Sequence, residues 1–171
     1  MLTFAIRNAR SDTPQRVLLG SRDEVQAALL GILGLAQREV RIMARDLAIF
    51  ALDRREVVES FERLFLANRR ARVRLLADDT QWLETRAPRL KRLQRSFTHS
   101  LQLRIVAGED AVGDEACVLV DSDTSLRLEH TARALGEVWL HNETRVQPLG
   151  ASFERRWDAA AHDLAVAPLG L

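Results

Sequence analysis

The chain of 171 residues contains one cysteine, one lysine, few aromatic residues and no long apolar run. A single thiol, Cys117, excludes an internal disulfide and is typical of a reducing compartment. The longest apolar run, residues 27–36, is far shorter than the ~18 residues that a membrane-spanning helix needs. The N-terminus becomes charged at Arg7, too early for a signal peptide. We therefore expect a cytoplasmic protein with no membrane partner.

An excess of charge of either sign is also missing. Lys and Arg number 25 against 24 Asp and Glu, which leaves a formal net charge of +1. Such a balance provides no general electrostatic attraction to nucleic acids or to anionic membranes. Lys91 is the only lysine, so nearly all cations are arginines, whose planar guanidinium suits contacts with phosphates and carboxylates.

The overall composition is that of an ordinary globular protein. Hydrophobic residues make up 47% of the chain and charged residues 29%, far from the composition of disordered chains. The length fits one domain, and we expect residues 1–171 to form it with a core over about 16–164. The apolar content, with 5% aromatic residues, is compatible with a buried interface.

Hydrophobic periodicity predicts alternating strands and helices. Ser21 with Glu24, and Asp53 with Glu56, have the spacing of capping boxes at the starts of two helices, the second ending near Asn68. A third helix covers about 88–97, with a separate turn before it, and a closing helix carries Phe153, Trp157, Ala161 and Leu164 at helical spacing. The predicted strands are residues 16–20, 40–44, 72–77, 101–106, 116–120, 125–129 and 137–141.

The order of these elements predicts an α/β fold. Strands and helices alternate as far as the fourth strand, which indicates parallel strands joined by crossover helices. The run 116–120 is apolar throughout, as expected of a central strand buried on both faces, and the strands after it indicate antiparallel additions. We expect one mixed sheet of about seven strands between helical layers.

The last third of the chain resembles one half of a protein of the phospholipase D superfamily. The resemblance rests on a buried strand ending at Asp121, a short hairpin, a strand with Gly136-Glu137, and a closing helix with Phe153 and Trp157. The preceding elements match the same half in order and length, so that the likeness extends from about residue 21 to residue 157. It implies a phospholipase D-like fold over nearly the whole chain.

The catalytic motif of that superfamily is His-x-Lys, four residues, Asp, six residues and Gly-Ser-x-Asn. With its aspartate at Asp121, Asp114 stands in place of the histidine and Ala116 in place of the lysine. Leu128, Glu129 and Thr131 stand in place of the glycine, serine and asparagine. In the family the histidine attacks phosphorus and the lysine holds the phosphoryl oxygens. Because an aspartate repels a phosphodiester and alanine has no charge, the resemblance implies a degenerate active site without phosphodiesterase activity.

The resemblance also bears on partners. Phospholipase D-like sites form between two halves, within one chain or in a homodimer, so a single half implies a protein that pairs. Similar single halves form a small bacterial family, some members of which are fused to or encoded beside acetyltransferases of the GNAT type. We therefore expect a non-catalytic binding, regulatory or accessory module, as a homodimer or with such a partner. The alternatives are a hydrolase that reuses the crevice and a nucleic-acid-binding remnant.

Several polar residues follow the predicted strands, where open α/β sheets bind ligands. Arg45, Asp46, Asp78, Asp79 and Asp121 are expected to converge on one crevice. Helix capping and turn chemistry are a simpler explanation for Asp46 and Asp79, whereas Arg45 has no such explanation.

His130 and Glu137 complete the candidate ligand site of Arg45, Asp78 and Asp121. If their strands are neighbours, His130 and His141 line the same sheet edge, although exposed strand-end residues are the more ordinary interpretation. The four histidines and Cys117 show none of the spacings of metal sites, and we expect no metal and no cofactor.

Arginines gather on one face of the third helix. Arg89, Arg92 and Arg95 are expected to point away from its apolar face, together with Arg86 and Lys91. A solvated helix face is the usual meaning of this pattern, and only Trp82 lies near for stacking on bases. Nucleic acid is therefore not the partner that we expect, and neutralising the arginines of this face would test that expectation.

Overall fold

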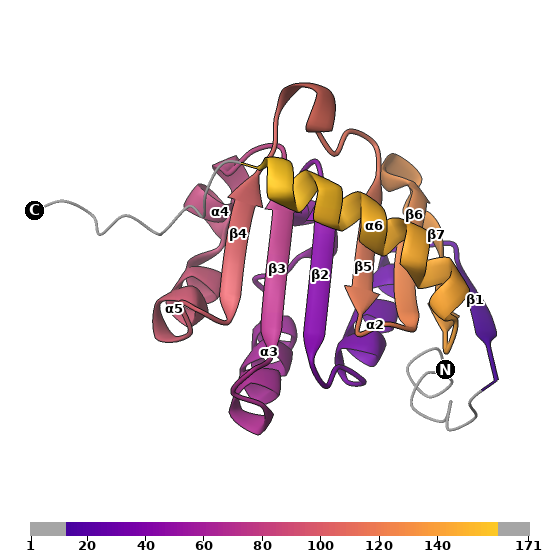
Figure 1. Cartoon of the computed structure of the whole chain (residues 1–171), viewed down its shortest axis with the longest axis horizontal. Coiled ribbons are helices and arrows are strands. Elements are labelled where there is room, and N and C mark those ends of the chain that lie inside the picture. The colour runs from indigo at the N-terminus through magenta and orange to yellow at the C-terminus, as the bar shows by residue number, and fades with distance from the viewer. Residues whose placement is uncertain (1–12, 161–171) are drawn as a thin grey trace, which may run out of the picture.

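The computed structural model describes residues 13–160, which form one seven-stranded sheet with helices on both faces (Figure 1). The strands are β1 (Gln15–Leu19), β2 (Glu39–Ala44), β3 (Arg72–Ala77), β4 (Leu101–Ile105), β5 (Ala116–Val120), β6 (Thr124–His130) and β7 (Leu135–Leu140). The α-helices are α2 (Arg22–Leu33), α3 (Arg55–Ala67), α4 (Gln81–Arg86), α5 (Pro88–Ser96) and α6 (Glu143–Ala159). Short 3-10 helices are η1 (Leu47–Phe50), η2 (Gly108–Asp110) and η3 (Thr131–Arg133). The predicted α/β class and mixed sheet are confirmed.

The strand order is β1-β7-β6-β5-β2-β3-β4. Strands β2, β3 and β4 are parallel, and β5, β6, β7 and β1 each run antiparallel to their neighbours. The expectation that the first strand belongs to the parallel block is wrong, because β1 lies at the far edge and pairs antiparallel with β7. Sequence alternation alone does not distinguish these two positions, since β1 is also followed by a helix.

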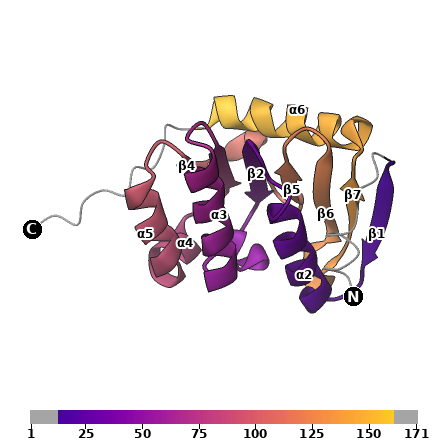
Figure 2. The same ribbon diagram turned by 90° about the horizontal axis from the view of Figure 1, so that it is seen from below.

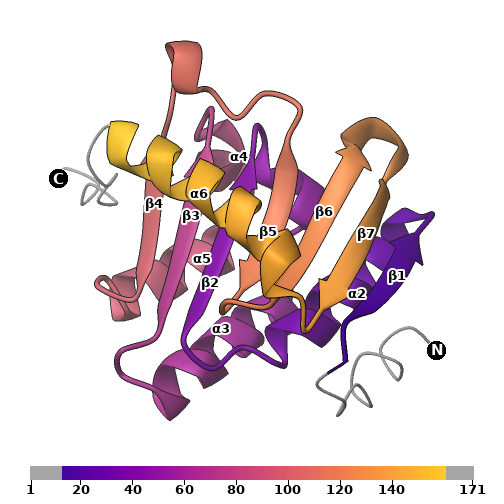
Figure 3. The ribbon, with the colours of Figure 1, turned by 45° about the vertical axis from the view of Figure 1, so that its right-hand side comes forward.

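The two helical layers are unequal. Helices α2, α3, α4 and α5 cover one face of the sheet, and α6 alone crosses the other (Figures 2 and 3). Every residue of β5 is buried, as predicted for a central strand. Leu29, Phe61 and Leu90 fill the core on the four-helix side, and Phe153 and Trp157 pack on Met43 and Leu76 under α6.

The helix boundaries confirm one of the two predicted capping boxes and correct the other. The Ser21 side chain accepts a hydrogen bond from the Glu24 N–H, as a capping box requires. Asp53 does not cap α3, because that helix begins after Arg54 and the Asp53 carboxylate accepts from the Leu90 N–H at 2.8 Å instead. Asp53 thus joins α3 to α5. Residues 161–171, with two predicted positions of the closing helix, lie outside the described range.

Candidate functional site

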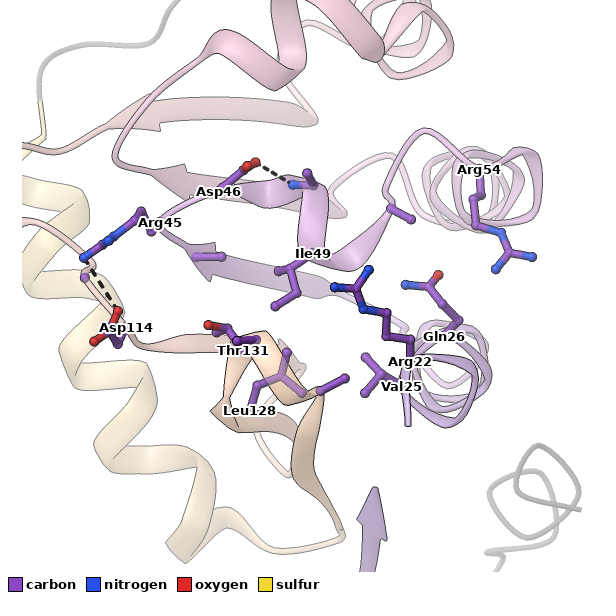
Figure 4. A pocket seen from close by; sticks show the side chains of 16 residues that line it. Arg22, Val25, Gln26, Arg45, Asp46, Ile49, Arg54, Asp114, Leu128 and Thr131 are labelled. Carbon is purple, nitrogen blue, oxygen red and sulfur yellow. Dashed lines mark hydrogen bonds and ion pairs between the residues drawn. The ribbon is translucent and has the colours of Figure 1, made fainter. Parts of the chain in front are cut away.

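A pocket of about 510 Å³ lies at the carboxyl ends of β2 and β6 and the amino end of β5. Ligand pockets in proteins commonly measure about 300–1,000 Å³. It is closed by α2, by the segment from β2 through η1 to α3, and by η3 (Figure 4). The polar residues that line it are Arg22, Gln26, Arg45, Asp46, Arg54, Asp114 and Thr131.

Two short turns form the walls of this pocket. The Asp46 carboxylate accepts a hydrogen bond from the Ala48 N–H at 2.8 Å and starts η1, which ends at Ala51. The other turn, η3, ends at Ala134. Ala51 and Ala134 both have left-handed backbone conformations, with φ of 46° and 52°, a conformation that costs an L-residue about 1–2 kcal/mol. Asp121 and His141, at the other end of the sheet, have the same conformation, so it is the polar lining at the ends of the strands that makes this pocket the first candidate.

Arg45 and Asp114 face each other across one end of the pocket (Figure 4). Their guanidinium and carboxylate groups lie 3.6 Å apart, and Arg45 also approaches Asp78 at 4.0 Å. The Asp78 carboxylate in turn accepts hydrogen bonds from the Val112 N–H at 2.6 Å and the Gly113 N–H at 3.1 Å. Asp78 therefore fixes the backbone that leads into Asp114. The hydrogen bonds of the Asp78 carboxylate thus stabilise the loop before β5.

Four of the six positions at which the resemblance puts the catalytic motif lie at or beside this pocket. Asp114, Leu128 and Thr131 line it. Ala116 is 1% exposed and pairs with Ala44 and Leu128, both of which line the pocket. At the position that the resemblance assigns to the histidine, the pocket has the Asp114 carboxylate, which is paired with Arg45. At the position that it assigns to the lysine stands the buried Ala116, which has no charge.

Arg45 and Asp78 come together as predicted, but Asp121 does not join them, and that part of the predicted convergence is wrong. Strand β5 runs antiparallel to β2, so the end of β5 lies at the start of β2. There the Asp121 carboxylate accepts hydrogen bonds from three consecutive backbone N–H groups, those of residues 37, 38 and 39, at 3.0, 2.9 and 2.9 Å. Asp121 thus anchors the turn between α2 and β2.

His130 and His141 lie at opposite ends of the sheet, which excludes the alternative that they line one edge. Their strands β6 and β7 are neighbours but antiparallel, so their carboxyl ends point in opposite directions. His130 lies at the same end as the pocket but is exposed and does not line it. The Nδ1 atom of His141 lies 3.1 Å from the Asp123 carboxylate, at the other end.

Glu137 also lies away from the pocket, on the opposite face of the sheet. The Glu137 residue is 8% exposed, and its carboxylate accepts a hydrogen bond from the Arg16 guanidinium at 2.6 Å. Burial alone would raise the pKa of Glu137, but the Trp139 indole and the Arg16 guanidinium outweigh burial and hold the pKa below its ordinary value. The side chain is therefore an ionised partner of Arg16 in the sheet and takes no part in the crevice.

The arginines of α5 are exposed, as predicted. Arg89 lies 3.6 Å from the Asp53 carboxylate. Arg89 and Arg92 share a groove with Glu59 and Glu62 of α3. Acidic side chains thus lie beside this basic face and offset its attraction for a polyanion.

The groups that serve metal or thiol chemistry are not assembled in the described part of the chain. Within residues 13–160, no three His, Cys, Asp or Glu side chains are placed to hold a metal ion. Burial raises the pKa of the Cys117 thiol to about 12, so this side chain is protonated near neutral pH. No helix between residues 13 and 160 is both long and apolar enough to cross a membrane.

Sequence reasoning missed Arg22, Gln26 and Arg54. Arg22 begins α2, and Arg54 immediately precedes α3. The two arginines are 32 positions apart in the chain, but they line the same pocket. No local spacing connects them, because the turn of η1 between β2 and α3 brings them together. The only signal in the sequence was that both arginines stand at helix starts, where the helix dipole does not favour cations.

Comparisons with solved structures identify the class of fold. TrmBL2, described as an archaeal chromatin protein with a novel mode of DNA binding, has a TM-score of 0.65 and 14% identity, over 91% of this chain and 55% of that chain. Phosphatidylserine synthase from Haemophilus influenzae has a TM-score of 0.56 and 15% identity, over 89% and 39% of the two chains. NucT from Helicobacter pylori has a TM-score of 0.58 and 8% identity, over 87% and 98%.

Phosphatidylserine synthase and NucT are members of the phospholipase D superfamily, and the fold of this chain is phospholipase D-like. The chain spans about half of TrmBL2 and two fifths of the synthase, but nearly all of NucT. Its sequence matches the family described as "Domain of unknown function (DUF7931)" over residues 21–169, and the chain belongs to that family. No curated protein matches it.

Proposed function

We propose that this chain is a non-catalytic phospholipase D-like domain that acts as a binding or regulatory module through the pocket at Arg45. The observation that carries the proposal is the ion pair between Arg45 and Asp114, at the position that the resemblance assigns to the nucleophile. An in-line attack on phosphorus requires a nucleophile and a cation on the phosphoryl oxygens. A paired carboxylate and the methyl group of Ala116 offer neither.

A partner chain is part of the proposal. The resemblance implies that this domain is one half of a two-part site, and the chain covers 98% of NucT. Leu18 and Leu66 are large apolar side chains that are 66% and 72% exposed. A second copy of the chain or an acetyltransferase would bury such side chains and complete the module in the cytoplasm.

The experiment measures hydrolysis of bis(p-nitrophenyl) phosphate by the purified chain, with static light scattering on the same sample. We expect nitrophenolate release no faster than that of the Asp114→Asn variant, together with a mass of two chains. Asp114→Asn is a suitable comparison because the Asp114 side chain is 96% exposed and its replacement does not disturb the core. Faster release by the wild-type chain, abolished by Arg45→Gln, would overturn the proposal.

Two alternatives predict other results. A hydrolase that reuses the crevice predicts turnover of a carboxylic ester such as p-nitrophenyl acetate that falls on replacing Arg45 or Asp114. A nucleic-acid-binding remnant predicts salt-dependent binding of duplex DNA that weakens on neutralising Arg89, Arg92 and Arg95 together. This alternative is the weaker one, because Glu59 and Glu62 line the same groove as Arg89 and Arg92.

A further inference from the structure

The cations of the pocket divide into two groups with different surroundings. Figure 4 shows the Gln26 side chain between those of Arg22 and Arg54 at one end, with the Arg22 guanidinium directed toward Ile49, and Arg45 and Asp114 at the other end. Arg45 has two carboxylates within 4.0 Å. Among residues 13–160, no carboxylate lies within ion-pair distance of Arg22, and Arg54 has only Glu56, at 3.9 Å. Two arginines thus share one carboxylate at the end formed by Arg22 and Arg54, and positive charge is in excess there.

The space between the two ends is apolar. Val25 and Leu128, both buried, and Ile49, partly buried, line it, as Figure 4 shows. Water in contact with such side chains is displaced favourably by an apolar group, at about 25 cal/mol for each Å² of apolar surface removed from water. The middle of the pocket thus favours a hydrocarbon or aromatic body over a chain of charged groups.

The far end disfavours a second anionic group. Asp46 and Asp114 both place carboxylates on the lining, and Asp114 is already paired with Arg45. A ligand with negative charge at both ends would bring like charges together there. The distribution of charge therefore selects a ligand with one anionic head.

We propose that the pocket binds an amphipathic anion, with a carboxylate or phosphate head on Arg22 and Arg54 and an apolar body along Val25, Ile49 and Leu128. The proposal rests on the binding function proposed above and specifies its ligand class. The guanidinium forks of two arginines hold such a head by charge-assisted hydrogen bonds, and the amide of Gln26 supplies a further donor. The left-handed turns at Ala51 and Ala134 hold the walls in place.

The test is calorimetric titration of the full chain with octanoate, octyl phosphate, octanol and inorganic phosphate. We expect octanoate or octyl phosphate to bind, whereas octanol lacks the charged head and inorganic phosphate lacks the apolar body, so each binds at least tenfold more weakly. The stronger of the first two ligands identifies the head group. Equal binding of octanol and octanoate would overturn the proposal, because the arginines would then contribute nothing.

Matched variants locate the site. Arg22→Gln and Arg54→Gln are each expected to weaken binding of the charged ligand about tenfold, which is the loss of about one charge-assisted hydrogen bond. Arg63→Gln is the control, because Arg63 is an exposed arginine of α3 that does not line the pocket. Ile49→Ala tests the apolar contact by a small truncation. Binding that Arg22→Gln and Arg54→Gln leave unchanged would overturn the assignment.

Failure of this inference and failure of the proposed function give different results. Hydrolysis of bis(p-nitrophenyl) phosphate would overturn the non-catalytic function whatever octanoate does. Absence of both hydrolysis and amphiphile binding would overturn the ligand class and leave the absence of catalysis intact.

Discussion

The guanidinium of Arg74 on β3 donates hydrogen bonds to both carboxylate oxygens of Glu154 on α6, at 2.8 and 2.6 Å. Arg41, the register neighbour of Arg74 on β2, approaches the same carboxylate at 3.3 Å. The same Arg74 guanidinium lies 5.2 Å from the ring centroids of Phe153 and Trp157. These contacts attach the only helix on this face of the described sheet, and they make the stability of the domain sensitive to acid.

Glu154→Gln is expected to destabilise the protein by about 1 kcal/mol near neutral pH, a modest value because the Glu154 side chain is 42% exposed and solvent screens the pair. Burial alone would raise the pKa of Glu154, but Arg74 and Arg41 outweigh it and lower the pKa below the ordinary 4.5. The contribution is therefore complete above the unfolded-state pKa and is lost as the pH falls through the folded-state pKa. Urea unfolding of the wild type and the variant at about pH 7 and about pH 3 measures the difference in the free energy of unfolding at each pH.

The difference between Glu154→Gln and the wild type should shrink over that acid range. Glu62→Gln on α3 is the control, since Glu62 is exposed and forms no ion pair among residues 13–160. A difference that stayed constant from neutral to acid pH would show that Glu154 does not act through its charge.

Asp121→Asn is expected to lower the free energy of unfolding by about 1–3 kcal/mol. The carboxylate accepts three backbone N–H groups, and the amide nitrogen of asparagine places a donor against one of them. Asparagine tolerates the left-handed conformation of this position, with φ of 51°, so the variant tests the hydrogen bonds and leaves the backbone unstrained. Asp158→Asn, an exposed change on α6, should stay within about 0.5 kcal/mol in the same denaturation experiment.

Ala51→Gly is expected to stabilise the protein by about 0.5–1 kcal/mol, although glycine usually destabilises folded proteins. The left-handed conformation at φ of 46° costs alanine more than it costs glycine. Ala151→Gly, an exposed substitution inside α6, should destabilise by about 1 kcal/mol. Thermal unfolding of the two variants compares them directly, and a loss of stability in both would mean that the η1 turn is not strained.

Gly136→Ala is expected to destabilise the protein by about 2–4 kcal/mol, a loss comparable to severe overpacking. A Cβ atom at this position would lie 2.3 Å from the Arg127 carbonyl oxygen and 3.1 Å from the Leu128 Cα, and neither backbone atom can move without disturbing β6. Gly20→Ala is the matched control, because its nearest neighbour is the flexible Glu24 carboxylate at 3.6 Å. Chemical denaturation should leave that variant within about 0.5 kcal/mol of the wild type.

Much of the fold follows from local patterns. The alternation of residues 72–77, the wholly apolar run 116–120 and the Ser21 capping box each predicted the element that the structure contains. The position of β1 was not predictable in this way, because its pairing with β7 depends on a partner more than a hundred residues away. The same holds for Asp53. It has the spacing of a capping box with Glu56, but its carboxylate accepts a hydrogen bond from the Leu90 N–H, which is distant in sequence.

The sequence by itself determined the class of fold, the burial of the central strand, and the presence of Asp114 and Ala116 where the resemblance puts a histidine and a lysine. Those features depend on periodicity and residue identity, which are local. Only the tertiary structure decided which polar residues meet. The antiparallel direction of β5 sends Asp121 to the far end of the sheet, and the η1 turn brings Arg54 into the same pocket as Arg22. Strand direction and chain reversal are set by contacts between distant segments, and no spacing along the chain encodes them.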